Sequence, residues 1–354
     1  GLFVCQKGAT TKYPISYVLW EKKRGAGFAA DSSLEEVVRK TKRANLWFKP
    51  LDSHQTASPW IIARRKALAA MSNMMGPSFY RARAGACTWA NGVYWFKVLA
   101  VRPDGLIMVE NIQEASRLPL RGVQTSMEPD LIYPLLRGRD VSRWKASPAV
   151  HILVPYRPDE GRPTKEAWLR AQLPYTFAYL KSFQTLLSNR SGYQKLLQAS
   201  GAPFYSLYDV GPYTFAPFKV VWREQAGLLT AAVVGQRDGK TVVPDHKLML
   251  IPLESSVEAH YVCAALNSCI PQLVINTNQA LENLSIQKFD ANSDTHARLC
   301  RLSQRAHELT SRSDAETQEE LAQLEEEINL AAADLWGITS EELVDVKRSL
   351  KELG

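Results

Sequence analysis

The spacing of hydrophobic residues divides the chain into a β-rich middle and helical flanks. Short apolar stretches separated by turn residues, typical of strands, occupy residues 98–101, 106–109, 151–155, 228–234 and 242–251. Apolar residues recur every three or four positions, as in helices, through residues 34–42, 58–75, 164–172, 174–189 and 258–266. From residue 296 onward the helical spacing dominates. These patterns predict an α+β fold with a mixed, largely antiparallel β-rich domain, inserted helices and a C-terminal helical segment.

Local signals refine the ends of these elements. Residues 1–23 are expected to form two strands, and residues 273–275 and 284–286 further short strands. Asn91-Gly92 favours a hairpin turn, and so does the segment 103–105. Ser58 is expected to cap a helix with Pro59 at its first position. Gly337 is expected to end a long helix, and Thr339 with Glu342 to form a capping box for a terminal one.

Charge is distributed unevenly along the 354 residues. The net charge is +7, but residues 1–300 hold 37 Lys and Arg against 23 Asp and Glu, whereas residues 301–354 hold 6 against 13. The body is therefore basic (+14) and the tail acidic (−7). A basic body suits a polyanionic partner, because cations on the protein displace the counterions of nucleic acids.

Composition also narrows the class of protein. A hydrophobic content of 45% is ordinary for a globular protein with a real core. No apolar run reaches the roughly 20 residues of a membrane span, so no membrane is expected as a partner. The five cysteines are scattered without a metal-ligand spacing, which favours reduced thiols in a cytoplasmic protein and no metal site.

The most distinctive segment is residues 131–144, where an apolar run leads into three arginines and a tryptophan. The apolar half is expected to anchor the segment, and Gly138 to allow a tight turn. Arg137, Arg139 and Arg143 would then project from a fixed base with guanidinium groups that suit phosphates and guanine edges. Trp144 offers a face for stacking or for packing. An ion-paired structural turn, with Asp140 or Asp130 neutralising an arginine, is the alternative interpretation.

Two weaker motifs suggest other chemistry. Residues 25–30 match the dinucleotide pattern G-x-G-x-x-A between a predicted strand and a helix, but no acidic residue follows where a ribose would need it. We therefore expect no cofactor in this chain. Asp238-Gly-Lys240 and Asp245-His-Lys247 resemble parts of a metal-dependent nuclease, although neither has an obvious upstream acidic partner.

Seven segments stand out together: residues 78–83, 88–95, 133–144, 213–222, 244–247, 267–268 and 327–342, of which Arg-Gly-Arg-Asp-Val-Ser-Arg-Trp144 is the most specific. In these segments the chain resembles the carboxy-terminal half of adenine-N6 DNA methyltransferases of the restriction-modification type, especially the fused type IIG enzymes. In that family an upstream Rossmann-like domain binds S-adenosylmethionine and carries a Pro-Pro tetrapeptide that holds the flipped adenine. This chain contains nineteen prolines and no Pro-Pro pair, so that catalytic centre is not in it.

The resemblance implies three parts of the chain with different roles. Residues 1–76 correspond to the end of the catalytic-domain strands plus connecting helices, 77–295 to the target recognition domain, and 296–354 to C-terminal amphipathic helices. The abrupt start without methionine fits a fragment of a longer polypeptide. The implied partners are double-stranded DNA and an upstream methyltransferase domain of the same polypeptide, and the implied cofactor of the parent protein is S-adenosyl-L-methionine.

In this interpretation the chain orients duplex DNA for methylation elsewhere and has no catalytic residue of its own. The expected DNA contacts are mainly cationic: Arg137, Arg139, Arg143, Trp144, Lys219, Arg223, Lys247, Arg81 and Arg83. Lysine and arginine would set the register on phosphates, and a few side chains would read bases. Two alternatives remain open, a metal-dependent nuclease fragment and a protein-interaction scaffold that uses the acidic helical tail.

Overall fold

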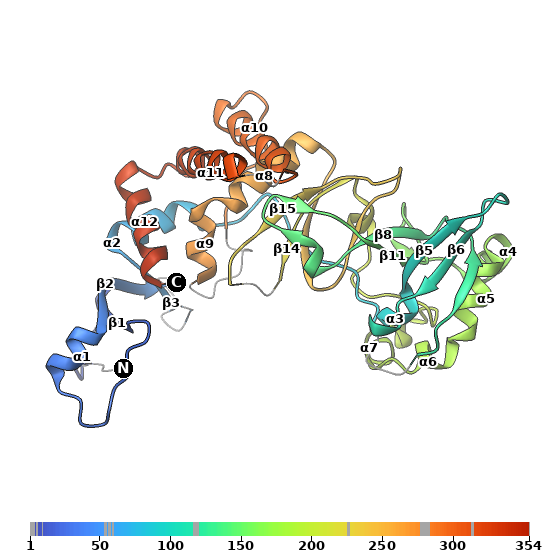
Figure 1. The fold of residues 1–354 in the computed structure, drawn as a ribbon, viewed down its shortest axis with the longest axis horizontal. Helices are drawn as coiled ribbons and strands as arrows, with labels where there is room; N and C mark the ends of the chain where they lie inside the picture. The colour runs from blue at the N-terminus through green and yellow to red at the C-terminus, as the bar shows by residue number, and fades with distance from the viewer. Residues whose placement is uncertain are drawn as a thin grey trace. The chain divides into compact units, whose positions relative to one another are not determined.

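The computed structural model describes residues 4, 6–8, 10–52, 55, 58, 60–115, 120–224, 227–276, 284–312 and 315–353. These fall into two compact units, each assembled from separate parts of the sequence (Figure 1). Unit 1 comprises Gly1–Phe79, Ser268–Gln287 and Glu326–Gly354, and unit 2 comprises Tyr80–Asn267 and Lys288–Glu325. None of the described helices is both long and apolar enough to cross a membrane.

Unit 1 contains an antiparallel three-stranded sheet in the order β1-β2-β3. Its strands are β1 (Ile15–Lys22), β2 (Thr41–Pro50) and β3 (Trp60–Ala63). The short helix α1 (Leu34–Lys40) lies in the connection between β1 and β2, and Ser33 caps it by accepting from the Glu36 backbone N–H.

The remaining helices of unit 1 come from distant parts of the chain. They are α2 (Arg65–Met74), α9 (Cys269–Asn276) and α12 (Ser340–Leu353). Helix α12 packs against both α2 and α9. The long helix α11 (Ala315–Leu335) contributes residues to both units.

Unit 2 is built around a six-stranded sheet in the order β16-β8-β11-β5-β6-β7. In that order the strands are Val243–Pro244, Ile132–Leu136, Val150–Leu153, Trp95–Val101, Ile107–Asn111 and Gln124–Met127. The pairing of β16 with β8 is parallel and the other pairings are antiparallel. Four helices add apolar residues to the core of this sheet: α4 (Glu166–Gln172), α5 (Pro174–Ser182), α6 (Gln184–Ser188) and α7 (Ser191–Leu196).

A second, antiparallel sheet of unit 2 has the order β15-β14-β17-β4. These strands are Ala231–Val234, Phe218–Arg223, Leu248–Leu253 and Arg83–Ala84. Helix α8 (Ser256–Asn267) packs on this sheet and also against α10 (Asp294–Leu309). Short elements complete the unit: α3 (Asn91–Tyr94), the ribbons β9 (Val141–Ser142) with β10 (Lys145–Ala146) and β12 (Tyr156–Arg157) with β13 (Arg162–Pro163), and the 3-10 turns η1 (Gln113–Ala115), η2 (Gly138–Asp140), η3 (Gln198–Ser200) and η4 (Pro212–Phe215).

The predicted α+β class is confirmed, together with several element ends. The turn at 103–105 joins β5 and β6, as its sequence indicates. The capping box before α12 is present: the Thr339 N–H and hydroxyl both donate to the Glu342 carboxylate, and the Glu342 N–H donates to the Thr339 hydroxyl. Gly337 has a φ of +61°, a left-handed conformation that suits glycine after a helix.

Other local predictions are wrong, for tertiary reasons. Asn91-Gly92 begins the helical turn α3 instead of a hairpin, and the Thr88 hydroxyl bonds both the Asn91 side chain and the Ala90 N–H. The helix expected from Ser58 begins only at Arg65, because β3 pairs with β2 before it; Pro59 lies outside the described residues. Residues 273–275 belong to helix α9, and Leu284 forms an isolated bridge to Met75. In residues 1–23 the described part contains one strand, β1, and not the two that were predicted; residues 1–3, 5 and 9 lie outside the described residues.

Candidate nucleic-acid interface

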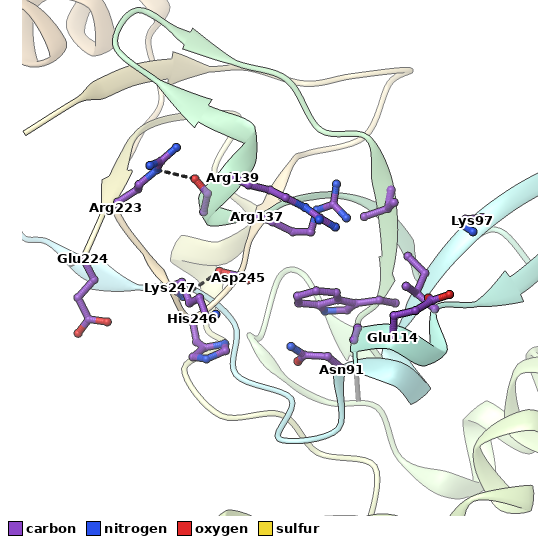
Figure 2. A pocket seen from close by; sticks show the side chains of 15 residues that line it. Asn91, Lys97, Glu114, Arg137, Arg139, Arg223, Glu224, Asp245, His246 and Lys247 are labelled. Carbon is purple, nitrogen blue, oxygen red and sulfur yellow. Dashed lines mark hydrogen bonds between the residues drawn. The ribbon is translucent and has the colours of Figure 1, made fainter. Parts of the chain in front are cut away.

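A cleft of about 1050 Å³ lies within unit 2, lined by strands and connections of both sheets (Figure 2). One wall comes from the six-stranded sheet and its turns, the other from β14 and the turn before β17, and η2 contributes as well. The polar lining residues are Asn91, Lys97, Glu114, Arg137, Arg139, Arg223, Glu224, Asp245, His246 and Lys247. Lysine and arginine therefore outnumber carboxylates in the lining.

The turn that carries the two central arginines is fixed by a largely buried ion pair. The Asp140 carboxylate accepts from the Arg137 backbone N–H at 3.0 Å and from its guanidinium at 2.7 and 3.0 Å. Only 11% of the Arg137 side chain and 9% of the Asp140 side chain are exposed. The interpretation of an ion-paired structural turn is thus correct for Arg137, whose guanidinium donates from two of its nitrogens to Asp140.

Residues of the second sheet also contact this turn and hold it in place. Arg223, at the end of β14, donates to the backbone carbonyls of Gly138 and Val141 at 2.7 and 2.8 Å. The Cβ atom of Lys247 lies 3.7 Å from the position that a Cβ on Gly138 would occupy. Contacts from β14 and from the turn before β17 therefore hold η2 in addition to the bonds within the turn itself.

A second turn, residues 245–247, faces η2. The Asp245 N–H donates to the Leu136 carbonyl at 2.9 Å, which continues the parallel pairing of β16 with β8. The Asp245 carboxylate accepts from the Lys247 N–H at 2.8 Å. Asp245 is only 2% exposed, and burial raises the pKa of its carboxyl above the ordinary value. Asp245 thus shapes the turn, while Lys247 remains exposed.

Arg139 differs from Arg137 in its surroundings. It is exposed and lines the cleft, and no acidic side chain pairs with it among the residues that the structure describes. Lys97 on β5 and Lys247 are likewise exposed at the cleft. The cleft therefore combines a rigid base, formed by Arg137, Asp140 and Arg223, with cations available to an external anion.

Five of the predicted contact residues lie elsewhere. Trp144 is 1% exposed; its indole N–H donates to Glu325 at 2.7 Å, and the Arg143 guanidinium also binds that carboxylate and the Asn267 carbonyl. Lys219 is 1% exposed and donates to the Ala216 carbonyl and the Thr241 hydroxyl. Burial lowers the pKa of Lys219 to about 7. Trp144 and Lys219 were predicted to contact DNA, but the structure places both in the interior. This prediction is corrected, because buried side chains do not reach a duplex.

Arg81 and Arg83 are exposed but do not line the cleft. Arg83 lies over the Tyr213 ring, with its guanidinium carbon 5.4 Å from the centroid. Conversely, sequence reasoning missed Asn91, Lys97, Glu114, Glu224 and the indole of Trp95 as lining residues. No local signal identifies Glu114. Lys97 could have been noticed as a charged residue within an otherwise apolar strand.

Two residues of the nuclease alternative, Lys240 and Asp245, have structural partners. Lys240 donates to the carbonyls of Pro129 and Ile132, and Asp238 occupies a turn with a φ of +52°. In the part of the chain that the structure describes, no group of three His, Cys, Asp or Glu side chains is arranged to hold a metal ion.

Comparison with known proteins gives one significant curated relative. The type II methyltransferase M.NspV of Nostoc sp. is 26% identical over 149 residues, which is 42% of this chain and 30% of that protein. The chain thus spans less than a third of the relative's length. No protein-family model matches the sequence.

Two solved structures are similar at low identity. The type IIL restriction-modification enzyme MmeI, solved in complex with DNA, has a TM-score of 0.48 at 10% identity and covers 88% of this chain and 40% of its own. The type IIG restriction endonuclease BpuSI has a TM-score of 0.34 at 12% identity, over 77% of this chain and 33% of its own.

Proposed function

We propose that this chain is the DNA-recognition module of a restriction-modification adenine-N6 DNA methyltransferase of type IIG. In this proposal it binds double-stranded DNA sequence-specifically and orients it, while an upstream domain of the same polypeptide methylates a flipped adenine. The observation that carries the proposal is the cleft of unit 2, in which exposed cations stand on a turn locked by the Arg137–Asp140 pair.

The cleft has the chemistry that duplex recognition requires. Arg139 offers a planar fork that can donate two hydrogen bonds to the O6 and N7 atoms of guanine. Lys97 and Lys247 are flexible point charges suited to phosphates, which set register without reading sequence. Asn91 and Glu114 add an amide and a carboxylate, groups that pair with adenine and with the cytosine amino group.

A rigid base improves such recognition. An arginine on a flexible loop would lose conformational entropy when it binds a base, whereas η2 is already held by Asp140 and Arg223. Base extrusion also requires the rest of the duplex to stay in place during the reaction. We therefore assign to Arg137 and Arg223 a positioning role, and to Arg139 and Lys247 direct contact with DNA. Arg143, Arg81 and Arg83 remain secondary candidates, and Trp144 and Lys219 are left out.

The relative named above is a methyltransferase, which supports the class of the parent protein. S-adenosylmethionine would bind to the upstream domain. The glycine-rich segment 25–30 of this chain does not fit a nucleotide cofactor, because β1 and β2 on either side of it pair antiparallel and α1 has only 7 residues. We propose no catalytic step through this chain, and we place the parent protein in a prokaryotic cytoplasm.

The proposal is tested by duplex binding with Arg139→Gln. A duplex enriched from a random-sequence pool by the wild-type chain serves as the probe, in a fluorescence anisotropy titration. Loss of a bidentate contact should weaken binding to that duplex by about 5-fold to 150-fold, the equivalent of roughly 1–3 kcal/mol. Discrimination against the unselected pool should fall by a similar factor.

Arg170→Gln is the matched control, because Arg170 is an exposed arginine of unit 2 that pairs with Glu166 on α4, away from the cleft lining. It should bind like the wild-type chain. Equal binding by wild type and Arg139→Gln would contradict the proposal, as would failure to enrich any duplex. Methyl transfer from labelled S-adenosylmethionine by the chain alone would contradict the absence of catalysis.

A further inference from the structure

Unit 1 has a basic hollow of its own, of about 460 Å³. Its lining comes from β1, β2, the residue before α2 and the last turns of α12. The charged lining residues are Glu21, Lys42, Arg43, Arg64, Arg348, Lys351 and Glu352. Five cations therefore face two carboxylates, in a chain whose last segment is strongly acidic.

Hydrogen bonds between Arg64 and the end of α12 fix one part of the lining. Arg64 donates through its Nε atom to Glu352 at 2.9 Å and through a second nitrogen to the other oxygen of the same carboxylate. Its backbone N–H donates to the hydroxyl of Ser349, which is fully buried. These bonds attach the end of α12 to the start of α2, so the lining residues on α12 are held in place against the sheet.

Arg64 and Glu352 neutralise each other in their ion pair. Lys42, Arg348 and Lys351 are exposed, and none of them forms an ion pair with a described residue. Arg43 is also exposed and lies over the Trp20 ring, 3.8 Å from its centroid, which orients its guanidinium. After Glu21 is counted, an excess of three positive charges remains around the hollow.

We propose that this hollow is a second nucleic-acid contact of the chain, one that binds backbone phosphates and reads no sequence. An excess of cations that have no carboxylate partner is maintained at an electrostatic cost, and a phosphate backbone removes that cost while it releases condensed counterions. The described lining of the hollow offers charged donors beside Leu19 and Ala44, and it contains no amide side chain for base edges. The inference rests on the proposed DNA-binding function.

The competing occupant is an acidic protein segment, such as the tail of a second copy of this chain. A simpler alternative is that Arg348 and Lys351 only complement the partial negative charge at the end of α12. Both alternatives differ from the proposal in a measurable way, because only phosphate contacts change the salt dependence of duplex binding.

The test compares the full chain with the double variant Arg348→Gln/Lys351→Gln, using a labelled duplex of random sequence over a range of salt concentrations. Each phosphate contact contributes about 0.9 to the slope of log affinity against log salt. The double variant should therefore lower the magnitude of the slope by about two, and it should weaken random and selected duplexes by the same factor.

Lys347→Gln is the matched control, because Lys347 is on the same helix but pairs with Glu326 and does not line the hollow. Thermal unfolding of each variant separates a fold defect from a contact defect. The proposal is overturned if the double variant keeps the wild-type slope, or if its slope matches that of Lys347→Gln. A change in self-association by light scattering, with the slope unchanged, would instead assign the hollow to an acidic partner.

Arg139→Gln in the same titrations keeps the two proposals apart. If that variant loses sequence discrimination while the α12 double variant binds normally, only the phosphate site is wrong. If neither variant nor wild type binds duplex in a salt-dependent manner, the proposed function itself fails.

Discussion

Arg137 and Arg139 are two positions apart, yet the structure gives them opposite roles. Arg137 is held by Asp140 with its side chain 11% exposed, whereas Arg139 is exposed at the cleft. A 3-10 turn has three residues per turn, so residues 137 and 140 meet on one side and residue 139 is directed elsewhere. One short motif thus supplies both a structural ion pair and a ligand-facing cation.

Replacing Asp140 with Ala should strongly destabilise unit 2. The change removes three hydrogen bonds to Arg137 and leaves a largely buried guanidinium without its partner, which costs up to about 3–5 kcal/mol of the free energy of unfolding. Urea denaturation followed by tryptophan fluorescence measures the loss. Asp104→Ala breaks an arginine–carboxylate pair that is exposed, so its midpoint should move far less. Equal midpoints for the two variants would show that the Arg137–Asp140 pair does not fix the turn.

At the scale of elements, the cleft depends on how closely β4 and its continuation approach the turn before β17. The Gly85 and Ala86 N–H groups donate to the carbonyls of Leu248 and Pro244, each at 2.9 Å. A Cβ atom on Gly85 would lie 2.2 Å from the Asp245 carbonyl oxygen and 2.6 Å from that of Pro244. Glycine is required here by the close approach of two backbones, not by an unusual φ.

Gly85→Ala should therefore displace the turn 245–247. Backbone atoms cannot swing aside as a side chain can, so the free energy of unfolding should fall by about 1–3 kcal/mol. Duplex affinity should fall as well, because Lys247 moves with the turn. Gly27→Ala is the control, since nothing lies within 4 Å of its added Cβ. A Gly85→Ala protein with unchanged denaturation midpoint and duplex affinity would refute this account of the turn.

At the scale of the whole molecule, unit 2 contains four histidines whose pKa values are lowered by burial: His151, His260, His296 and His307. Burial, with a smaller effect of His307, lowers the pKa of His260 to about 4. The rings of His260 and His307 are 4.9 Å apart, and His307 Nε2 accepts from the Val233 N–H. The α8–α10 packing thus requires these rings to be neutral.

Stability should therefore decrease on mild acidification. The folded pKa of His260 lies below the value of about 6.5 in an unfolded chain, so the unfolded state binds the proton first. Stability is complete above about pH 6.5 and is lost as the pH falls toward about 4. His260 alone should account for up to about 2 kcal/mol between pH 7 and pH 5. Urea midpoints across this range measure the loss, and His260→Asn should reduce it; an identical pH dependence in that variant would contradict the assignment.

Much of the fold was predictable because its signals are local. The capping box at Thr339 and Glu342 and the turn between β5 and β6 depend on residues a few positions apart. The hairpin expected at Asn91-Gly92 failed because the Thr88 side chain, together with contacts from Asn111 to the Gly92 carbonyl, favours a helical turn. The strand predicted at residues 273–275 was wrong because a short apolar run fits a buried helix as well as a strand, and these residues belong to α9.

The candidate interface was predicted only in part, because the exposure of a side chain does not follow from the local sequence. The sequence alone determined a basic body, an arginine-rich turn and the absence of a Pro-Pro tetrapeptide, because these follow from composition and short motifs. Only the tertiary structure decided which cations face outward. Glu325, which binds Arg143 and Trp144, is more than 180 positions away from them. Lys219 is buried by packing within unit 2. Charge is a property of a residue, but exposure depends on contacts between distant segments.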